Sequence, residues 1–254
     1  MVFPCFLLRC KAAHVVCSTC RNSHSQVCDR AGAGASAYAA CAEVDAFVQD
    51  AKTPCAFREH GCESYVAYHE QAEHRRACPW APCSCPDHDC AFFSSPARLL
   101  EHLGARQSRS VTVVSYGKPC RLEVPPPRGW RVLVAGEDRR LFLVSASALG
   151  AATAVAVVCV SANGGAAGAP QFVCKLWVEA PHGRAYVGVM RSVVRSSNLA
   201  RGFVAADQGM FLAVPLELLR NAAGEAAVLT VPIDRAGAAA GSSTPAARSS
   251  RRVQ

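Results

Sequence analysis

Seven cysteine and histidine residues between positions 55 and 102 follow one repeated spacing. The intervals of the first set recur at once in the second: Cys55-x6-Cys62-x11-His74-x3-Cys78, then Cys83-x6-Cys90-x11-His102. Thiolate sulfur and imidazole nitrogen are the usual ligands of tetrahedral structural zinc sites. Because chance rarely repeats both intervals, the pattern predicts a pair of zinc fingers over residues 55–107, with Zn²⁺ as the bound metal.

The second ligand set leaves two questions open. Cys85 could replace Cys83 through a Cys85-x4-Cys90 pair, although the repeat favours Cys83. Gln107, five residues after His102, is a poor zinc ligand, so the site has three protein ligands completed by water or Cys85, or it binds zinc weakly. No Glu is placed as a general base beside a cleft-like constellation, which argues against a catalytic zinc site.

Short elements are expected to hold these ligands in place. In the first set, His74 and Cys78 are four residues apart and therefore share one face of a helix. In the second set, Ser95 and Pro96 are a suitable N-cap and first helical residue, which places His102 late on a helix. Each finger buries little apolar surface, so metal binding is expected to supply much of its folding free energy.

Cysteine and histidine concentrate in the first part of the chain, with 12 of 15 Cys in residues 1–90 and 7 of 8 His in residues 1–102. The N-terminus lacks the charged region and cleavage site of a secretory signal, and no uncharged apolar run reaches the length of a membrane span. We therefore expect reduced, metal-binding thiols rather than disulfides, a location in the cytoplasm or nucleus, and no membrane partner. Cys159 and Cys174 lie in apolar runs and are expected in a core.

The net charge of +8 lies outside the predicted metal module. Residues 1–110 contain 11 Lys and Arg against 11 Asp and Glu, whereas residues 111–254 contain 16 against 8. A DNA-reading finger carries basic residues on its own helix, because phosphate contacts supply most of its affinity. The neutral finger region argues against nucleic acid as a partner. Part of the excess lies in residues 236–254, an Ala-, Gly- and Ser-rich segment predicted to be a disordered tail.

The segments on either side of the fingers differ from them in pattern. Residues 42–54 predict a short amphipathic linker helix with Val44, Phe47 and Val48 on one side. In residues 111–235, runs rich in β-branched and aromatic residues alternate with Gly and Pro, which predicts an antiparallel sandwich or barrel. The expected strands lie within 131–135, 141–145, 154–161, 172–179, 185–194, 210–214 and 227–233.

The fingers resemble those of the seven-in-absentia family of ubiquitin ligases, in particular its plant SINA-like branch. The similarity spans about residues 8–235. It implies an α+β multidomain fold, in which small zinc-stabilised fingers precede a TRAF-like antiparallel β-sandwich that binds substrates. Besides the two ligand sets, the similar stretches include residues 59–62, 74–79, 99–103, 116–117, 136–138, 148–150, 157–160, 174–177 and 211–215.

Upstream of the fingers, a further group of ligand-type residues resembles the central part of the family's RING finger. A RING holds two zinc ions through interleaved ligands and binds a ubiquitin-charged conjugating enzyme. The family has a Cys-x2-Cys pair before this group, and Cys5 stands too close to Cys10 to belong to such a pair. After the group, Ala31 stands where the family has the cysteine that pairs with Cys28. The resemblance thus implies a degenerate or truncated RING over residues 1–41. Its possible metal ligands are Cys10, His14, Cys17, Cys20 and Cys28.

The resemblance implies that the chain recruits substrate proteins for ubiquitination and proteasomal degradation. A RING ligase orients the thioester of the conjugating enzyme toward a substrate lysine, which is a proximity effect, so no residue is expected to be catalytic. The implied partners are substrate proteins, a ubiquitin-conjugating enzyme and a homo- or heterodimeric family member bound through the β-domain. The incomplete RING leaves an alternative, a non-catalytic adaptor that binds substrates or full-length relatives.

Overall fold

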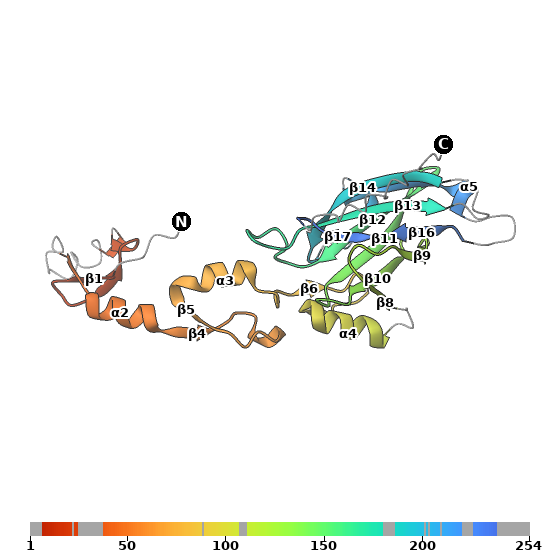
Figure 1. Ribbon diagram of the computed structural model, residues 1–254. Helices are drawn as coiled ribbons and strands as arrows, with labels where there is room; N and C mark the ends of the chain where they lie inside the picture. The colour runs from red at the N-terminus through yellow and green to blue at the C-terminus, as the bar shows by residue number, and fades with distance from the viewer. Residues whose placement is uncertain are drawn as a thin grey trace, which may run out of the picture.

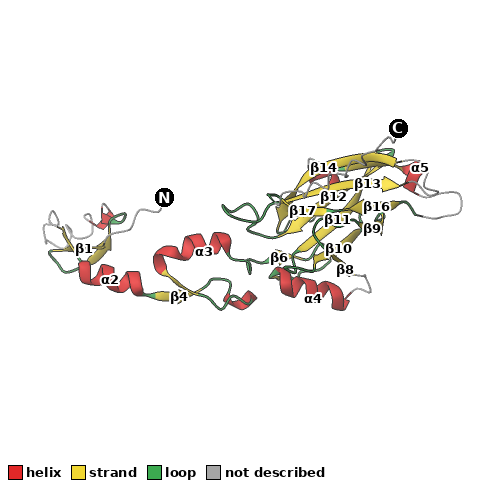
Figure 2. Cartoon of the chain, in the orientation of Figure 1, coloured by secondary structure: helices red, strands yellow, loops and turns green. Residues whose placement is uncertain are grey.

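In the computed structural model, a small N-terminal sheet and two fingers precede one large β-structure (Figures 1 and 2). In the described part of the chain, no helix has the length and apolar character needed to cross a membrane. The cysteines in this part form no disulfide. The structure describes residues 7–21, 23–24, 38–87, 89–106, 111–179, 186–200, 202, 204–208, 210–219 and 226–237.

A three-stranded antiparallel sheet begins the described chain, with the order β2-β1-β3. Its strands are β1 (Leu7–Cys10), β2 (Val15–Cys17) and β3 (Tyr38–Ala40). Helix α2 (Ala42–Asp50) follows, and the backbone N–H of Leu7 donates to Asp45 Oδ1 at 2.8 Å. This bond ties the helix to the first strand.

The predicted linker helix is shorter than expected. Residues after Asp50 leave the helix and form strand β4 (Lys52–Pro54), which pairs with β5 (Tyr65–Ala67). Pro54 explains the early end, because proline lacks an N–H and disfavours helical geometry in the residue before it. On the expected apolar side, Val44 and Val48 are half-buried whereas Phe47 is 75% exposed, so the described residues cover that side only in part.

Each finger consists of a two-stranded antiparallel pair followed by a helix. The first finger continues from β4 and β5 through the short 3₁₀ turns η1 (Arg58–His60) and η2 (Tyr68–Glu70) to α3 (Gln71–Ala77). The second contains β6 (Cys83–Ser84), β7 (Phe93–Ser94) and α4 (Pro96–Arg106), and α4 begins at the predicted proline.

The remaining strands form a ten-stranded, mostly antiparallel sheet with the order β8-β10-β11-β12-β14-β13-β16-β9; β15 pairs with β12 and β17 with β13. Each of the seven predicted runs overlaps at least one of these strands, and the last run overlaps both β16 and β17, which confirms the expected fold of fingers followed by a β-sandwich. Strands β8 and β9 lie outside the predicted runs. The bounds are β8 (Val111–Val114), β9 (Cys120–Glu123), β10 (Trp130–Ala135), β11 (Leu141–Leu149), β12 (Ala152–Val160), β13 (Phe172–Glu179), β14 (Tyr186–Ser197), β15 (Leu212–Pro215), β16 (Val228–Val231) and β17 (Ile233–Arg235); short helical segments η3 (Ala205–Gln208) and α5 (Leu216–Leu219) flank β15.

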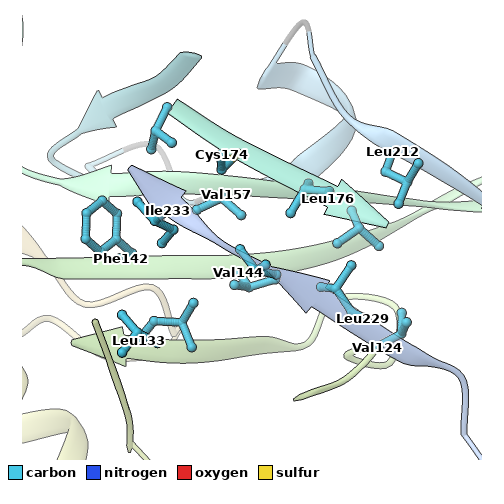
Figure 3. Close-up of a cluster of buried hydrophobic side chains, with 14 of the residues drawn as sticks. Val124, Leu133, Phe142, Val144, Val157, Cys174, Leu176, Leu212, Leu229 and Ile233 are labelled. Carbon is cyan, nitrogen blue, oxygen red and sulfur yellow. The ribbon is translucent and has the colours of Figure 1, made fainter. Parts of the chain in front are cut away.

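Strand β14 lets the sheet fold into two layers. Its first part runs antiparallel to β13, and its end runs parallel to β12 through the pair Val158 and Arg195. Side chains from both layers then share one core, which includes Phe142, Leu176 and Leu229 (Figure 3). Cys159 and Cys174 are buried in this core, as predicted, and burial raises the pKa of each thiol to about 11.

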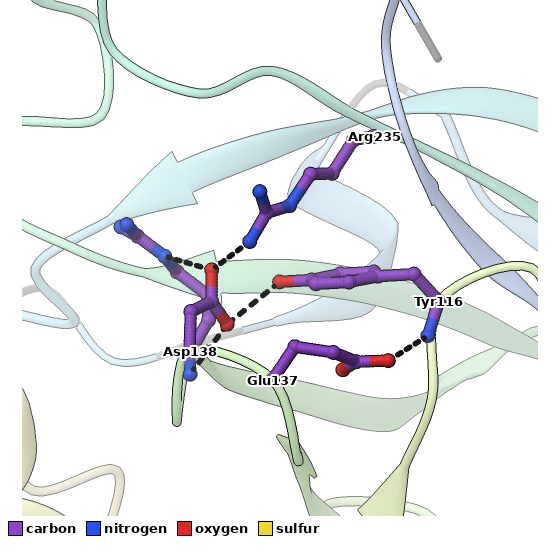
Figure 4. A network of polar contacts seen from close by, with 5 residues as sticks. Tyr116, Glu137, Asp138 and Arg235 are labelled. Carbon is purple, nitrogen blue, oxygen red and sulfur yellow. Dashed lines mark hydrogen bonds and ion pairs between the residues drawn. The ribbon is translucent and has the colours of Figure 1, made fainter. Parts of the chain in front are cut away.

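A polar network joins three separate segments at one edge of the sandwich (Figure 4). Tyr116 donates from its hydroxyl to Asp138 Oδ1 at 3.0 Å, and its backbone N–H donates to Glu137 Oε1 at 3.1 Å. Arg235 lies 2.8 Å from Asp138 Oδ2 and covers the Tyr116 ring. Burial and the Asp138 carboxylate raise the pKa of Tyr116, which therefore stays a neutral donor. Two stretches of the family resemblance, 116–117 and 136–138, thus meet in a structural contact.

Candidate metal centres

The first finger brings its four predicted ligands together. The ligand atoms of Cys55, Cys62, His74 and Cys78 all lie within 4.8 Å of one another. His74 Nε2 is 3.2 Å from Cys55 Sγ and 3.5 Å from Cys62 Sγ, and the Cys55 and Cys78 sulfurs are 3.9 Å apart. Tetrahedral zinc with its usual bond lengths places sulfur and nitrogen ligands about 3.6–3.8 Å apart. These three distances lie within about 0.4 Å of those values, so the group suits a zinc ion.

Local backbone geometry shapes this first site. Cys55 follows strand β4 directly, and the backbone N–H of Phe57 donates to its sulfur at 3.3 Å. Gly61 has φ +111°, and a Cβ there would lie 2.6 Å from the Trp80 ring. Only glycine satisfies both conditions, so the turn that delivers Cys62 depends on it. His74 lies on α3, and Cys78 caps the C-terminus of that helix instead of sharing its face.

The thiols of the first site differ in acidity. Burial and the neighbouring sulfurs of Cys62 and Cys55 raise the pKa of Cys78 to about 12. Burial also acts to raise the pKa of Cys62, but hydrogen bonds with Ser64 and His74 outweigh it and lower that pKa to about 6. A metal ion that binds here must displace protons from thiols, which makes its affinity fall as the pH falls.

The second group contains Cys85, Cys90 and His102. Cys90 Sγ is 3.3 Å from His102 Nε2, and the imidazole stacks on Phe92 with ring centroids 4.0 Å apart. The backbone N–H of Cys85 donates to the Phe92 carbonyl at 2.9 Å, which positions its thiol beside the other two ligands. The structure thus takes the alternative pairing through Cys85 that the spacing left open.

Cys83 lies outside this second group, contrary to the assignment that the repeat favoured. It is fully buried in an apolar cluster with residues of the sandwich, and burial raises the pKa of its thiol to about 12. The following residue, Ser84, donates its backbone N–H to the Asn198 carbonyl at 2.8 Å. Contact with the sandwich therefore takes Cys83 out of the ligand group.

No fourth ligand joins the second group among the described residues. In the first finger three residues separate His74 from Cys78, and the same interval after His102 leads to Arg106. A guanidinium is cationic and is no zinc ligand. Gln107 lies outside the described residues.

A third group lies in the N-terminal sheet and consists of Cys10, His14 and His24. His24 was not predicted as a ligand, because only its distance of four residues from Cys20 hints at a role. Cys17 and Cys20 are neighbours, with the Cys20 N–H donating to Cys17 Sγ at 3.3 Å, but they join no ligand group in the described chain. Cys28 lies outside the described residues.

The two fingers attach to the sandwich in different ways. Leu99 and Leu103 of α4 are buried in a cluster with Trp130, Leu141 and other outward residues of β10, β11 and β12. Because alternate residues of these strands face the inner core, the three strands are buried on both sides. The first finger contacts the sandwich through hydrogen bonds from Asn163.

Asn163 links the first finger to the loop after β12. Its Nδ2 donates to the Cys78 carbonyl at 2.9 Å and to the Arg75 carbonyl at 3.0 Å. Both acceptors lie at the C-terminal end of α3, where carbonyls lack partners within the helix. Arg98 of α4 also donates to the Glu59 carbonyl at 2.8 Å, so the two fingers touch each other.

Comparison with known proteins identifies the finger region. The family model described as "Sina, zinc finger" matches residues 47–119. This segment is similar to the Sina zinc finger. The matched segment includes both ligand groups and extends beyond β8 of the sandwich, which agrees with the shared apolar cluster of α4 and the sheet. The expected resemblance to the seven-in-absentia family is confirmed over this segment.

Curated relatives carry the same family name. The chain is 26% identical over 110 residues to the putative E3 ubiquitin-protein ligase SINA-like 6 of Arabidopsis thaliana, covering 43% of this chain and 39% of the relative. It is 28% identical over 116 residues to SINA-like 11 of that plant, covering 45% and 36%. It is 27% identical over 99 residues to the E3 ubiquitin-protein ligase sina of Drosophila melanogaster, covering 38% and 31%. The matches thus span about two fifths or less of the relatives' length.

Proposed function

We propose that this protein serves in SINA-type ubiquitination: its fingers bind Zn²⁺, and its TRAF-like sandwich recruits substrate proteins for ubiquitination and proteasomal degradation. One observation carries the proposal: the Sina zinc finger packs on the outer face of the sandwich through Leu99 and Leu103. A substrate held by the sandwich therefore keeps a set position relative to the fingers. Ubiquitin transfer by proximity needs such a fixed relation between substrate and conjugating enzyme.

The partners in this proposal are substrate proteins and a ubiquitin-conjugating enzyme, since the relatives are named E3 ubiquitin-protein ligases. A second family member bound through the sandwich, and a location in the cytoplasm or nucleus, belong to the same proposal. No residue of the chain acts covalently, because the thioester chemistry belongs to the conjugating enzyme. The fingers act as a zinc-stabilised support.

A second candidate is a non-catalytic adaptor that pairs with full-length relatives. Ala31 stands where the RING pattern has its last cysteine, and Cys10 and His14 group with His24. The surface that binds a conjugating enzyme is formed by two loops, each held by a zinc ion, at a fixed distance and orientation. The ligands of this chain differ from those of a RING with two such zinc sites. The adaptor keeps the substrate-binding sandwich and leaves contact with the conjugating enzyme to its partner.

An autoubiquitination assay with a panel of conjugating enzymes separates the two candidates. We expect the chain alone to form few or no ubiquitin chains, and to be ubiquitinated or to promote ubiquitination when a full-length SINA-like relative is added. The control variants are His14→Ala, in the N-terminal group, and His69→Ala, whose side chain is exposed. Robust chains from the wild type and His69→Ala, lost in His14→Ala, would establish a working RING and exclude the adaptor.

A further inference from the structure

We propose that Cys10, His14 and His24 form a third zinc site, in which His24 takes a ligand position that the RING pattern assigns to a cysteine. The ligand atoms of these three residues lie within 4.8 Å of one another. The set consists of one sulfur and two imidazole nitrogens, which is a donor combination that suits zinc. No Asp or Glu of the described residues belongs to this group. A hard cation such as Mg²⁺ or Ca²⁺ prefers oxygen ligands, and the group offers no carboxylate.

Three local structures bring the ligands together. Cys10 ends strand β1, and a tight turn leads to His14, with the Cys10 N–H donating to the His14 carbonyl at 3.0 Å. The Ala13 N–H donates back to the Cys10 carbonyl at 2.9 Å. A helical turn then carries His24, whose N–H donates to the Cys20 carbonyl at 3.0 Å. These backbone hydrogen bonds fix the turn that holds Cys10 and His14 together and the helical turn that carries His24.

The His24 ring is placed as a ligand would be. It meets the His14 ring edge to face, with centroids 5.3 Å apart and planes at 88°. Its Nε2 atom is buried and makes no hydrogen bond within the described structure. A buried imidazole nitrogen without a partner costs free energy. Coordination of a metal ion by His24 removes that cost and explains why the Nε2 atom of this half-buried ring is turned away from solvent.

In the described part of the chain, the N-terminal sheet has a small apolar core. Its buried cluster contains Cys10, and Ala12 and Tyr38 are the described residues that pack against it. A sheet of three short strands with so small a core needs a further source of folding free energy. A metal ion shared by β1, the following turn and the helical turn at His24 supplies it.

The test is the metal content of the purified full chain and of matched His24 variants. His24→Ala and His24→Phe are expected to lose one zinc per chain by elemental analysis, although Phe retains ring packing against Tyr38. His24→Cys is expected to keep the ion, because cysteine is also a zinc ligand. In the Co²⁺-substituted protein, His24→Cys should gain thiolate-to-metal absorption and Cys10→Ser should lose it. His69→Ala is the control for removal of an exposed histidine.

The zinc of the fingers serves as an internal standard, since a chain that fails to fold loses those ions as well. Full metal content in His24→Phe, or loss of the ion in His24→Cys with the finger zinc retained, would overturn the proposal. Loss of the ion in Cys28→Ser, with the zinc content of His24→Ala unchanged, would also overturn the proposal. It would mean that Cys28 is the ligand, as the RING pattern has it. Because the readout is metal content, it stands apart from the outcome of the autoubiquitination assay.

Discussion

The two fingers share one sequence spacing but are stabilised differently. The first has four clustered ligands and a small apolar group in which Phe57 and Trp80 pack against the cysteines. The second has three clustered ligands, and its helix is buried on the sandwich through Leu99 and Leu103. A finger that packs against a large sheet depends less on its metal, because apolar burial supplies free energy that the isolated finger obtains from coordination.

The largest expected effect is in the first finger. Cys62→Ser should remove its zinc and unfold residues 55–78, because structural zinc contributes about 10–16 kcal/mol to such units. Elemental analysis and limited proteolysis of the full chain measure the loss. Cys159→Ser is the matched control; it places a hydroxyl in the sandwich core and should cost about 1–3 kcal/mol without loss of zinc. A Cys62→Ser chain that keeps its zinc and resists proteolysis would contradict the dependence on metal.

Leu99→Ala tests the apolar anchor of the second finger. Leu99 is fully buried between α4 and the sheet, and truncation of such a side chain costs about 2–5 kcal/mol. Chemical denaturation of the full chain should show a lower free energy of unfolding in the transition that reports on the sandwich. Glu101→Ala, an exposed position on the same helix, should leave that transition unchanged. An unchanged transition in Leu99→Ala would mean that burial of this α4 side chain does not stabilise the sheet.

A pair of cysteine variants sharpens the comparison within the second finger. Cys85→Ser should lose the second zinc while α4 stays packed on the sheet, since Leu99 and Leu103 remain. Cys83→Ser should keep the zinc and lose about 1–3 kcal/mol, because it buries a hydroxyl among apolar residues. Elemental analysis and thermal unfolding distinguish the two. Loss of zinc in Cys83→Ser, with zinc retained in Cys85→Ser, would show that Cys83 and not Cys85 is the ligand, as the repeat favoured.

The smallest expected effect is at the contact between the first finger and the sandwich. Asn163→Ala removes two hydrogen bonds to carbonyls at the end of α3, each worth about 0.5–1.5 kcal/mol. Zinc content should stay constant, while amide hydrogen exchange around residues 75–78 should become faster. Asn198→Ala is the matched control, since Asn198 contacts the second finger through its backbone carbonyl and its side chain accepts only a local hydrogen bond from the Ala200 N–H. Unchanged exchange in Asn163→Ala would show that the finger is held without this side chain.

The ligands of the first finger, the helix that starts at Pro96 and the seven strand runs follow from local information in the sequence. Ligand spacing, an N-cap pair and β-branched runs act over a few residues, so they can be recognised without tertiary contacts. The end of α2 could also have been placed from Pro54, since its effect on the preceding backbone is local.

Only the tertiary structure decides which cysteine of the second finger joins the ligand group. Cys83 and Cys85 are equivalent in type and nearly so in spacing, and both are buried in the same apolar cluster. They differ in their neighbours, because the Cys83 thiol lies beside Ala162 and Cys159 of the sandwich whereas the Cys85 thiol lies beside Cys90. In the same way, His24 joins Cys10 and His14 through folding of the N-terminal sheet. The sequence alone determined that this protein has Cys and His ligands for zinc fingers followed by a β-sandwich. The choice among neighbouring ligands depended on packing between residues distant in the chain, which spacing does not encode.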